Sequence, residues 1–174
     1  PFGLHGSLEL YASSRALVDR CRNSLQSSRA SSLRGLDSSG GLSAQAIASA
    51  AEAGDELAVE LVMKTADYLA FGAVSVMHVL NPEAILLGGA MTFGRHDTQI
   101  GRQFLKQLRE QILRQTFEIP GKQTVVDYAA LGADAGVIGA AAWASERLRD
   151  EDSPAELQTD ESRRPHWRRC QPIA

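Results

Sequence analysis

The chain has 174 residues, of which 44% are hydrophobic and 22% are charged, and its formal net charge is −3. This length is enough for one domain with a hydrophobic core, and so small a net charge gives no whole-chain argument for binding nucleic acid or a membrane surface. No apolar run reaches the roughly 20 residues of a membrane-spanning helix. The two cysteines, Cys21 and Cys170, are too few for a disulfide framework. We therefore expect a cytoplasmic protein with reduced thiols and no membrane partner.

The first part of the chain predicts a helix followed by a loop. Apolar residues at three- and four-residue spacing indicate a helix over about residues 8–25. Residues 26–43 are rich in serine and glycine, a composition that buries little apolar surface. We expect this second segment to be a loop with a mobile middle.

Capping residues mark the next two helices. Ser43 is suited to the N-cap of a short helix that stops at Gly54, and Asp55 is suited to the N-cap of a long helix that follows. The pair Asn81-Pro82 ends this long helix. Its apolar residues cover more than one face, which is typical of a central, buried helix.

The second half of the chain alternates strands and helices. A short apolar run at 84–89 predicts a buried strand, and residues 97–116 form an amphipathic pattern typical of a surface helix. A second strand is predicted at 124–132, and a helix of small residues at 133–150. This order indicates an α/β fold, but two strands are too few for a complete α/β sheet.

The ends of the chain suggest how it is organised. It opens with Pro1 in the middle of a pattern, so we expect a fragment that is truncated at its N-terminus. From Asp150 the sequence turns polar and charged. We therefore expect one lobe over residues 1–149 and a disordered tail over 150–174.

A Gly-Gly pair follows the first predicted strand, in the stretch "LNPEAILLGGAM". Glycine there costs backbone entropy and packs no side chain, so its use needs a reason such as a tight turn or a ligand close to the backbone. About forty residues later, "LGADAGVIGAAAWA" opens the helix of small residues. Together, the two elements would let a nucleotide approach bare backbone and let a helix lie tight against the sheet.

Four segments in order resemble the ROK family of sugar kinases and sugar-responsive repressors, from about Gly3 to Leu148. "GSLELYASSRAL" resembles the family's "GCLExYASxxAL", and "IASAAEAGDELAVE" resembles its helix pair. "LNPEAILLGGAM" resembles its "NPxxIVLGGG" strand and turn, and "LGADAGVIGAAAWA" its closing helix. The resemblance implies an actin-like ATPase (ribonuclease H-like) fold, in which two α/β lobes hold sugar and ATP between them. This chain would be the C-terminal lobe, with the N-terminal lobe missing.

The same resemblance implies residues that bind sugar and nucleotide. Glu9 matches the family's glutamate that binds sugar hydroxyls, and a carboxylate can accept hydrogen bonds from two hydroxyls at once. Without the resemblance, Glu9 would be interpreted as an acid stabilised by a helix N-terminus. Gly88, Gly89 and Ala90 match the family's adenosine-binding turn, with Ala90 where a third glycine is frequent. ATP and Mg²⁺ are the implied cofactors.

Two departures from the family pattern limit what this chain can do. The family holds a structural zinc ion with three cysteines and one histidine, but Phe2 and Ser7 stand in place of two of these cysteines, and His5 cannot form a site by itself. We therefore expect the zinc site to be lost and no other metal site. The family's phosphate loop and catalytic aspartate lie upstream of this motif. We expect no catalytic residue in this chain, and no activity of the chain alone.

The function implied is ATP-dependent phosphorylation of a hexose, with glucose as the first candidate sugar. Two alternatives stay open: a sugar-responsive transcriptional repressor, whose DNA-binding region would lie upstream, and an inactive truncated homologue. The retained Gly-Gly turn favours the kinase, because a repressor need not keep a nucleotide site. We expect sugar and ATP as partners and a homodimer for the intact protein. A nucleic-acid partner is expected only for the repressor.

Overall fold

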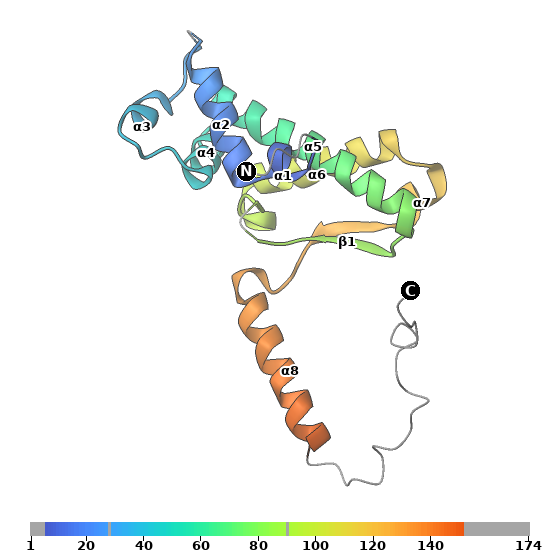
Figure 1. The fold of residues 1–174 in the computed structure, drawn as a ribbon. Helices are drawn as coiled ribbons and strands as arrows, with labels where there is room; N and C mark the ends of the chain where they lie inside the picture. Colours follow the sequence, from blue (N-terminus) through green and yellow to red (C-terminus); the bar gives the residue numbers. More distant parts are fainter. Residues whose placement is uncertain (1–5, 28, 90, 152–174) are drawn as a thin grey trace, which may run out of the picture. The chain divides into compact units, whose positions relative to one another are not determined.

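The computed structural model describes residues 6–27, 29–89 and 91–151 (Figure 1). The chain divides into two compact units, with the boundary between Gly132 and Ala133. The first unit contains every helix and strand up to the second strand, and the second contains the last helix. The expected division into a lobe over 1–149 and a tail over 150–174 stays a prediction, since most of the tail lies outside the described residues.

In chain order, the elements of the first unit are α1 (Glu9–Ala12), α2 (Ser14–Leu25), α3 (Arg34–Ser38), α4 (Ala44–Glu52), α5 (Glu56–Leu80), β1 (Ala84–Leu87), the 3₁₀ helix η1 (Arg95–Asp97), α6 (Gln99–Gln115), α7 (Glu118–Gln123) and β2 (Val125–Tyr128). A second 3₁₀ helix, η2 (Gly132–Asp134), leads into α8 (Ala135–Glu151) in the second unit. The expected order of helix, strand, helix, strand and helix is therefore present.

Side-chain caps set the limits of several helices. Ser43 caps α4 by accepting a hydrogen bond from the Ala46 amide, and Asp55 caps α5 by accepting one from the Ala58 amide. Both caps were predicted from the sequence. Asn81 ends α5 in the left-handed conformation, with φ +45°. The predicted starts of these two helices are therefore confirmed.

The predicted helix over residues 8–25 is divided into two. Ser13 takes an extended conformation, with φ −95° and ψ 166°, and its hydroxyl accepts a hydrogen bond from the Ala16 amide. Serine favours such local bonds over the regular helix, so it ends α1 and begins α2. The prediction of one continuous helix was wrong at this residue.

The serine-rich segment 26–43 contains a helix that its composition did not predict. Leu33 and Leu42 are buried in the hydrophobic core, with exposed fractions of 0% and 7%. Arg34 donates hydrogen bonds to the carbonyl oxygens of Leu25, Ser27 and Arg29. These anchors place α3 inside a segment that was expected to be a loop.

The two strands form a parallel pair in which Ala84 is opposite Val125 and Leu87 is opposite Tyr128. Val126 and Tyr128 are buried against the helices. Leu86 is 61% exposed, but α8 belongs to the other unit, so the burial of β1 stays a prediction. Within the first unit, the helices cover one face of this parallel pair.

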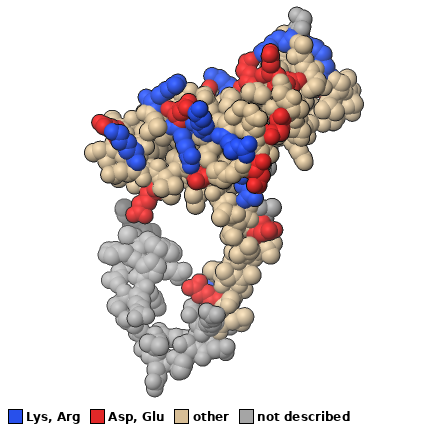
Figure 2. All heavy atoms as spheres, turned by 180° about the vertical axis from the view of Figure 1, so that it is seen from behind, with Lys and Arg blue, Asp and Glu red and all other residues tan. Residues whose placement is uncertain are grey.

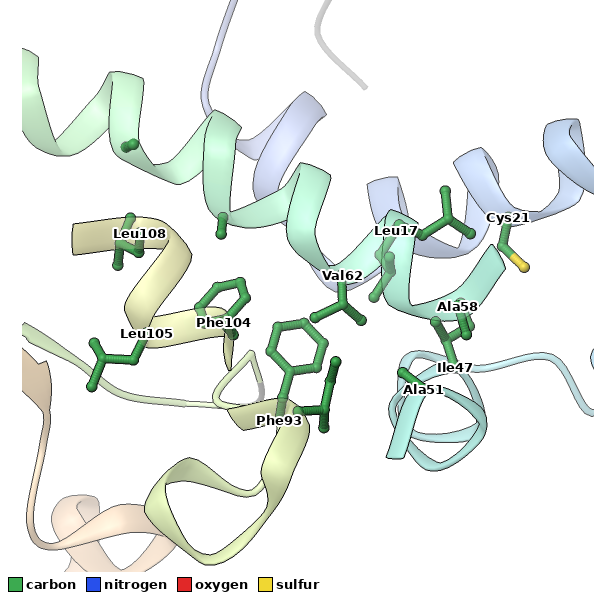
Figure 3. Close-up of a cluster of buried hydrophobic side chains, with 14 of the residues drawn as sticks. Leu17, Cys21, Ile47, Ala51, Ala58, Val62, Phe93, Phe104, Leu105 and Leu108 are labelled. Atoms are coloured by element: carbon green, nitrogen blue, oxygen red, sulfur yellow. The ribbon is translucent and has the colours of Figure 1, made fainter. Parts of the chain in front are cut away.

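Helix α5 is the centre of the first unit and packs against α1, α2, α4 and α6 (Figure 1). Its buried side chains join those of α2, α4 and α6 in one hydrophobic core, which includes Leu17, Ile47, Val62 and Phe104 (Figure 3). The predicted central position of α5 is confirmed. Its C-terminal part is less covered, since Phe71 and Val79 are 61% and 81% exposed.

The surface agrees with the small net charge of the sequence. On the face shown in Figure 2, acidic and basic side chains lie beside each other over the helical part of the first unit. No helix within the described ranges is both long and apolar enough to span a membrane.

Candidate functional site

The Gly-Gly turn directly follows β1 and has an unusual backbone. Gly89 has φ +77°, a conformation that residues with a side chain rarely adopt. Among the described residues, a Cβ atom added to Gly89 would meet nothing within 4 Å, and one added to Gly88 would meet the Ala129 Cβ at 3.9 Å. Backbone conformation therefore explains Gly89, and no described residue of the first unit fills the space over it. Ala90 lies outside the described residues.

The loop over residues 92–98 follows this turn and has a strained backbone. Phe93, Gly94 and Arg95 have φ angles of +49°, +82° and +54°. For residues other than glycine such angles are costly, and they persist only where the surroundings hold them. Phe93 is 6% exposed, and its ring centroid lies 4.7 Å from that of Phe104 (Figure 3). Thr98 adds a hydrogen bond from its hydroxyl to the Phe93 carbonyl oxygen.

A cavity of about 610 Å³ lies between α4 and this loop. The α4 side is made of Ala44, Gln45, Ala48, Ser49 and Glu52, and the other side of Thr92, Phe93, Gly94, Thr98 and Ile100. Methyl groups and one phenyl ring alternate with a few hydroxyl and amide groups, as in pockets that bind small organic molecules. The Thr92 hydroxyl donates to the Gly89 carbonyl oxygen at 3.4 Å, so the cavity adjoins the Gly-Gly turn.

Glu52 joins the two walls of this cavity. Its Oε1 accepts a hydrogen bond from the Gln99 amide at 2.9 Å, and its Oε2 accepts one from the Ile100 amide at 2.7 Å. The Ile100 amide, followed by the Gln99 amide, lowers the pKa of Glu52. A carboxylate is also favoured here because these amides belong to the N-terminus of α6. Glu52 therefore holds α4 against the start of α6.

Charged side chains gather around Asp127 on β2. Its Oδ1 lies 2.8 Å from the His96 Nε2 and accepts a hydrogen bond from the Tyr128 amide at 2.7 Å. Its Oδ2 lies 3.3 Å from an Arg109 guanidinium nitrogen. The Tyr128 amide is the main cause that lowers the pKa of Asp127, with smaller contributions from His96 and Arg109. Asp127 therefore connects β2 to both η1 and α6.

Glu9 occupies the first turn of α1 and is exposed. Within the described residues, its carboxylate has no side-chain hydrogen bond or ion pair. Arg20 holds the short helix in place by donating to the Tyr11 carbonyl oxygen and, at 2.6 Å, to the Thr65 hydroxyl. The role of Glu9 as a sugar-binding residue stays a prediction.

The remaining sequence predictions have mixed outcomes. Asp55 is a helix cap, as expected, and not a candidate base. Phe2 and His5 lie outside the described residues, so the loss of the zinc site stays a prediction. Sequence reasoning missed Glu52, His96 and Asp127. One local signal could have indicated the cavity wall. Ala44 and Ala48 are four residues apart, so they lie on the same face of α4, where their small side chains leave space.

Comparisons with known proteins agree on one family. The ROK family model matches residues 2–147. A glucokinase from Halalkalibacterium halodurans is 31% identical over 140 residues, which cover 79% of this chain and 40% of the relative. A solved ROK family glucokinase from Streptomyces griseus, in complex with glucose and AMPPNP, has a TM-score of 0.68 and 26% identity. That match covers 83% of this chain and 46% of the glucokinase.

A regulator is also among the similar structures. A ROK family transcriptional regulator, a homologue of the E. coli MLC protein, has a TM-score of 0.61 and 27% identity. This match covers 72% of the present chain and 30% of the regulator. The chain thus spans less than half the length of each of these relatives. Because the family model matches most of its residues, this chain belongs to the ROK family.

Proposed function

We propose that this chain is the C-terminal lobe of an ATP-dependent hexose kinase with the actin-like fold. The observation that carries the proposal is the cavity of about 610 Å³ beside an open Gly-Gly turn. A repressor need not keep a nucleotide site, whereas a kinase requires one. The likeness to a glucokinase in complex with glucose and AMPPNP supports the same function.

The cavity between α4 and the loop 92–98 is the proposed adenosine site. A purine is flat and largely apolar, so it suits a space bounded by the methyl groups of Ala44 and Ala48 and by Phe93. The Gln45 amide can both donate to and accept from the edge of a base. Gly88, Gly89 and Ala90 would then lie beside the ribose and phosphates, where a bare backbone allows close approach.

Glu9 is the proposed sugar-binding residue. Its exposed carboxylate could accept hydrogen bonds from two neighbouring hydroxyls of a hexose. Glucose is the first candidate, because two relatives are glucokinases and one of them was solved with glucose. Glu9 would orient the sugar and would not remove its proton.

In the proposed reaction, ATP supplies the phosphoryl group, and Mg²⁺ neutralises the charge that develops on it. The residues of this chain orient the two substrates, one at Glu9 and one in the cavity. Such positioning supplies much of the catalysis in phosphoryl transfer. The phosphate loop and the base belong to the other lobe in this proposal, so this chain alone should be inactive. We propose a homodimer for the intact kinase.

Filling the cavity tests the proposal. Ala48 lines the cavity, whereas Ala46 lies on the same helix, is also half-buried and does not line it. Ala48→Trp should abolish binding of an ATP analogue to the 174-residue chain, measured by calorimetry, and Ala46→Trp should leave it unchanged. Circular dichroism would show whether both variants fold.

The outcomes separate kinase from repressor. Binding to the unaltered chain that is lost only in Ala48→Trp supports the nucleotide site. A chain that binds no nucleotide favours the repressor, to which the likeness with the ROK family regulator also points. Equal binding by a well-folded Ala48→Trp would place the nucleotide elsewhere.

A further inference from the structure

The loop 92–98 forms one wall of the cavity, but its backbone does not favour this shape. Two of its residues, Phe93 and Arg95, have positive φ angles although they are not glycine. Such residues revert to ordinary conformations unless contacts hold them. The first half of the loop is held by the buried Phe93 ring. Its second half, η1, is exposed and needs another anchor.

That anchor is the contact between η1 and the end of β2. His96 lies 2.8 Å from the Asp127 carboxylate, and its ring meets the Tyr128 ring edge-on at 5.2 Å. The neighbouring Arg95 donates to the Ala130 carbonyl oxygen at 3.2 Å. Two successive residues of the loop are therefore fixed to the strand end that lies next to the Gly-Gly turn.

Asp127 is itself held in position for this contact. The Tyr128 amide and Arg109 bind its two carboxylate oxygens, and the Arg109 Nε donates to the Val126 carbonyl oxygen at 2.7 Å. Arg102 reaches from α6 to the His96 carbonyl oxygen at 2.6 Å. The loop, the strand and α6 thus converge on one pair of side chains, neither of which lines the cavity.

We propose that His96 and Asp127 are positioning residues of the nucleotide site, which hold the loop 92–98 in the shape that binds the nucleotide. The inference rests on the proposed function, since it gives the pair a role at that same site. The pair is ionic when His96 is protonated and remains a hydrogen bond when the ring is neutral. The cavity wall depends on the bond itself, so a neutral donor at position 96 should preserve most of the effect.

Two variants of His96 and one control test this inference on the full 174-residue chain. His96→Ala removes the bond, whereas His96→Gln keeps an N–H donor at a similar reach. Glu60→Ala is the matched control, because it removes one partner of another exposed ion pair, in which Arg29 and Glu60 lie 2.6 Å apart. The measurements are the dissociation constant of an ATP analogue and hydrogen exchange of the amides in residues 93–98.

His96→Ala should weaken nucleotide binding about tenfold, the loss expected for one hydrogen bond to a charged group. His96→Gln should recover most of that affinity, and Glu60→Ala should not change it. The loop amides should exchange faster in His96→Ala only. A change in affinity without a matching change in thermal stability would show that the pair acts on the site and not on the fold.

The exchange measurement separates this inference from the proposed function. If His96→Ala exchanges its loop amides no faster than the unaltered chain, or binds the nucleotide equally well, the inference is overturned. If the loop amides exchange faster but the unaltered chain binds no nucleotide, the proposed function fails, and with it the role of the pair at that site.

Discussion

The proposed sugar side and the proposed nucleotide side of this chain are built differently. Glu9 is a single exposed carboxylate on a one-turn helix, which Arg20 ties to α5. The nucleotide side has a cavity with two walls, and Glu52 joins these walls to each other. This difference suggests that the chain forms most of one binding site and contributes one group to the other. The two sites should therefore respond to mutation independently.

The largest expected effect comes from the Gly-Gly turn. Gly89→Val adds a β-branched side chain both to the open space over the turn and to a backbone with φ +77°. We expect nucleotide binding to the chain to fall below detection in calorimetry. Gly40→Val is the matched control, since Gly40 has φ +75° and also has nothing within 4 Å of an added Cβ.

Both glycine variants should lose similar stability, because both place a side chain in a left-handed conformation. Only Gly89→Val should lose the nucleotide. Tight binding by a folded Gly89→Val would remove the Gly-Gly turn from the proposed site, and loss of binding in Gly40→Val would show a general effect of strain.

The next effect concerns the sugar side. In the intact kinase that we propose, Glu9→Gln keeps the size of the side chain but replaces a charged acceptor with an amide. Hydrogen bonds to charged groups contribute about 1.5–3 kcal/mol, so the affinity for glucose should fall about ten- to a hundredfold. The affinity for ATP should not change.

Glu56→Gln is the control for this change, because Glu56 is also an exposed acid in the first turn of a helix. Sugar titration of both variants by intrinsic fluorescence would provide the comparison. Equal sugar affinity in Glu9→Gln and the unaltered kinase would show that Glu9 does not bind the sugar.

The smallest effect is expected at a residue that belongs to neither site. Asp55 caps α5 and also accepts hydrogen bonds from Ser31 and Ser32. Asp55→Ala should lower the free energy of unfolding by about 1–2 kcal/mol. The affinities for sugar and nucleotide should stay the same. Chemical denaturation together with ligand titration would test both statements.

The contribution of Asp55 should also depend on pH. Burial opposes its ionisation, but the hydrogen bonds from Ala58, Ser32 and Ser31 outweigh burial, so its pKa is lowered in the folded chain. A lowered pKa stabilises the fold above the pKa of the unfolded state, about 3.9 for an aspartate, and this stabilisation is lost as the pH falls further. Below that pH, the difference between Asp55→Ala and the unaltered chain should shrink.

Local signals in the sequence predicted the local parts of the fold. Ser43 and Asp55 were predicted as caps because a cap depends on residues three positions away. The sequence indicated Gly89 because a glycine at the end of a strand loses backbone entropy and packs no side chain, so it needs a structural reason. The structure gives one, a positive φ angle. The short helix α3 could not be predicted in this way, since it depends on the burial of Leu33 against distant residues.

The candidate site was predictable only in part for the same reason. Glu52 and the amides it binds are separated by 47 and 48 residues, and His96 and Asp127 by 31. No periodicity or local motif brings such residues together, so the sequence indicated the Gly-Gly turn but not the cavity beside it. The family resemblance supplied Glu9, whose own surroundings give no signal.

The pairing of β1 with β2 leaves strand edges that bear on how the isolated protein behaves in solution. Each strand has one neighbour in the described part of the chain, so the outer side of each presents a row of backbone donors and acceptors. Leu86 and Val125 add exposed apolar surface beside these rows, with exposed fractions of 61% and 55%. Such edges are templates for strands from other molecules. We therefore expect the pairing that supports the Gly-Gly turn also to favour self-association of the isolated first unit through these strand edges.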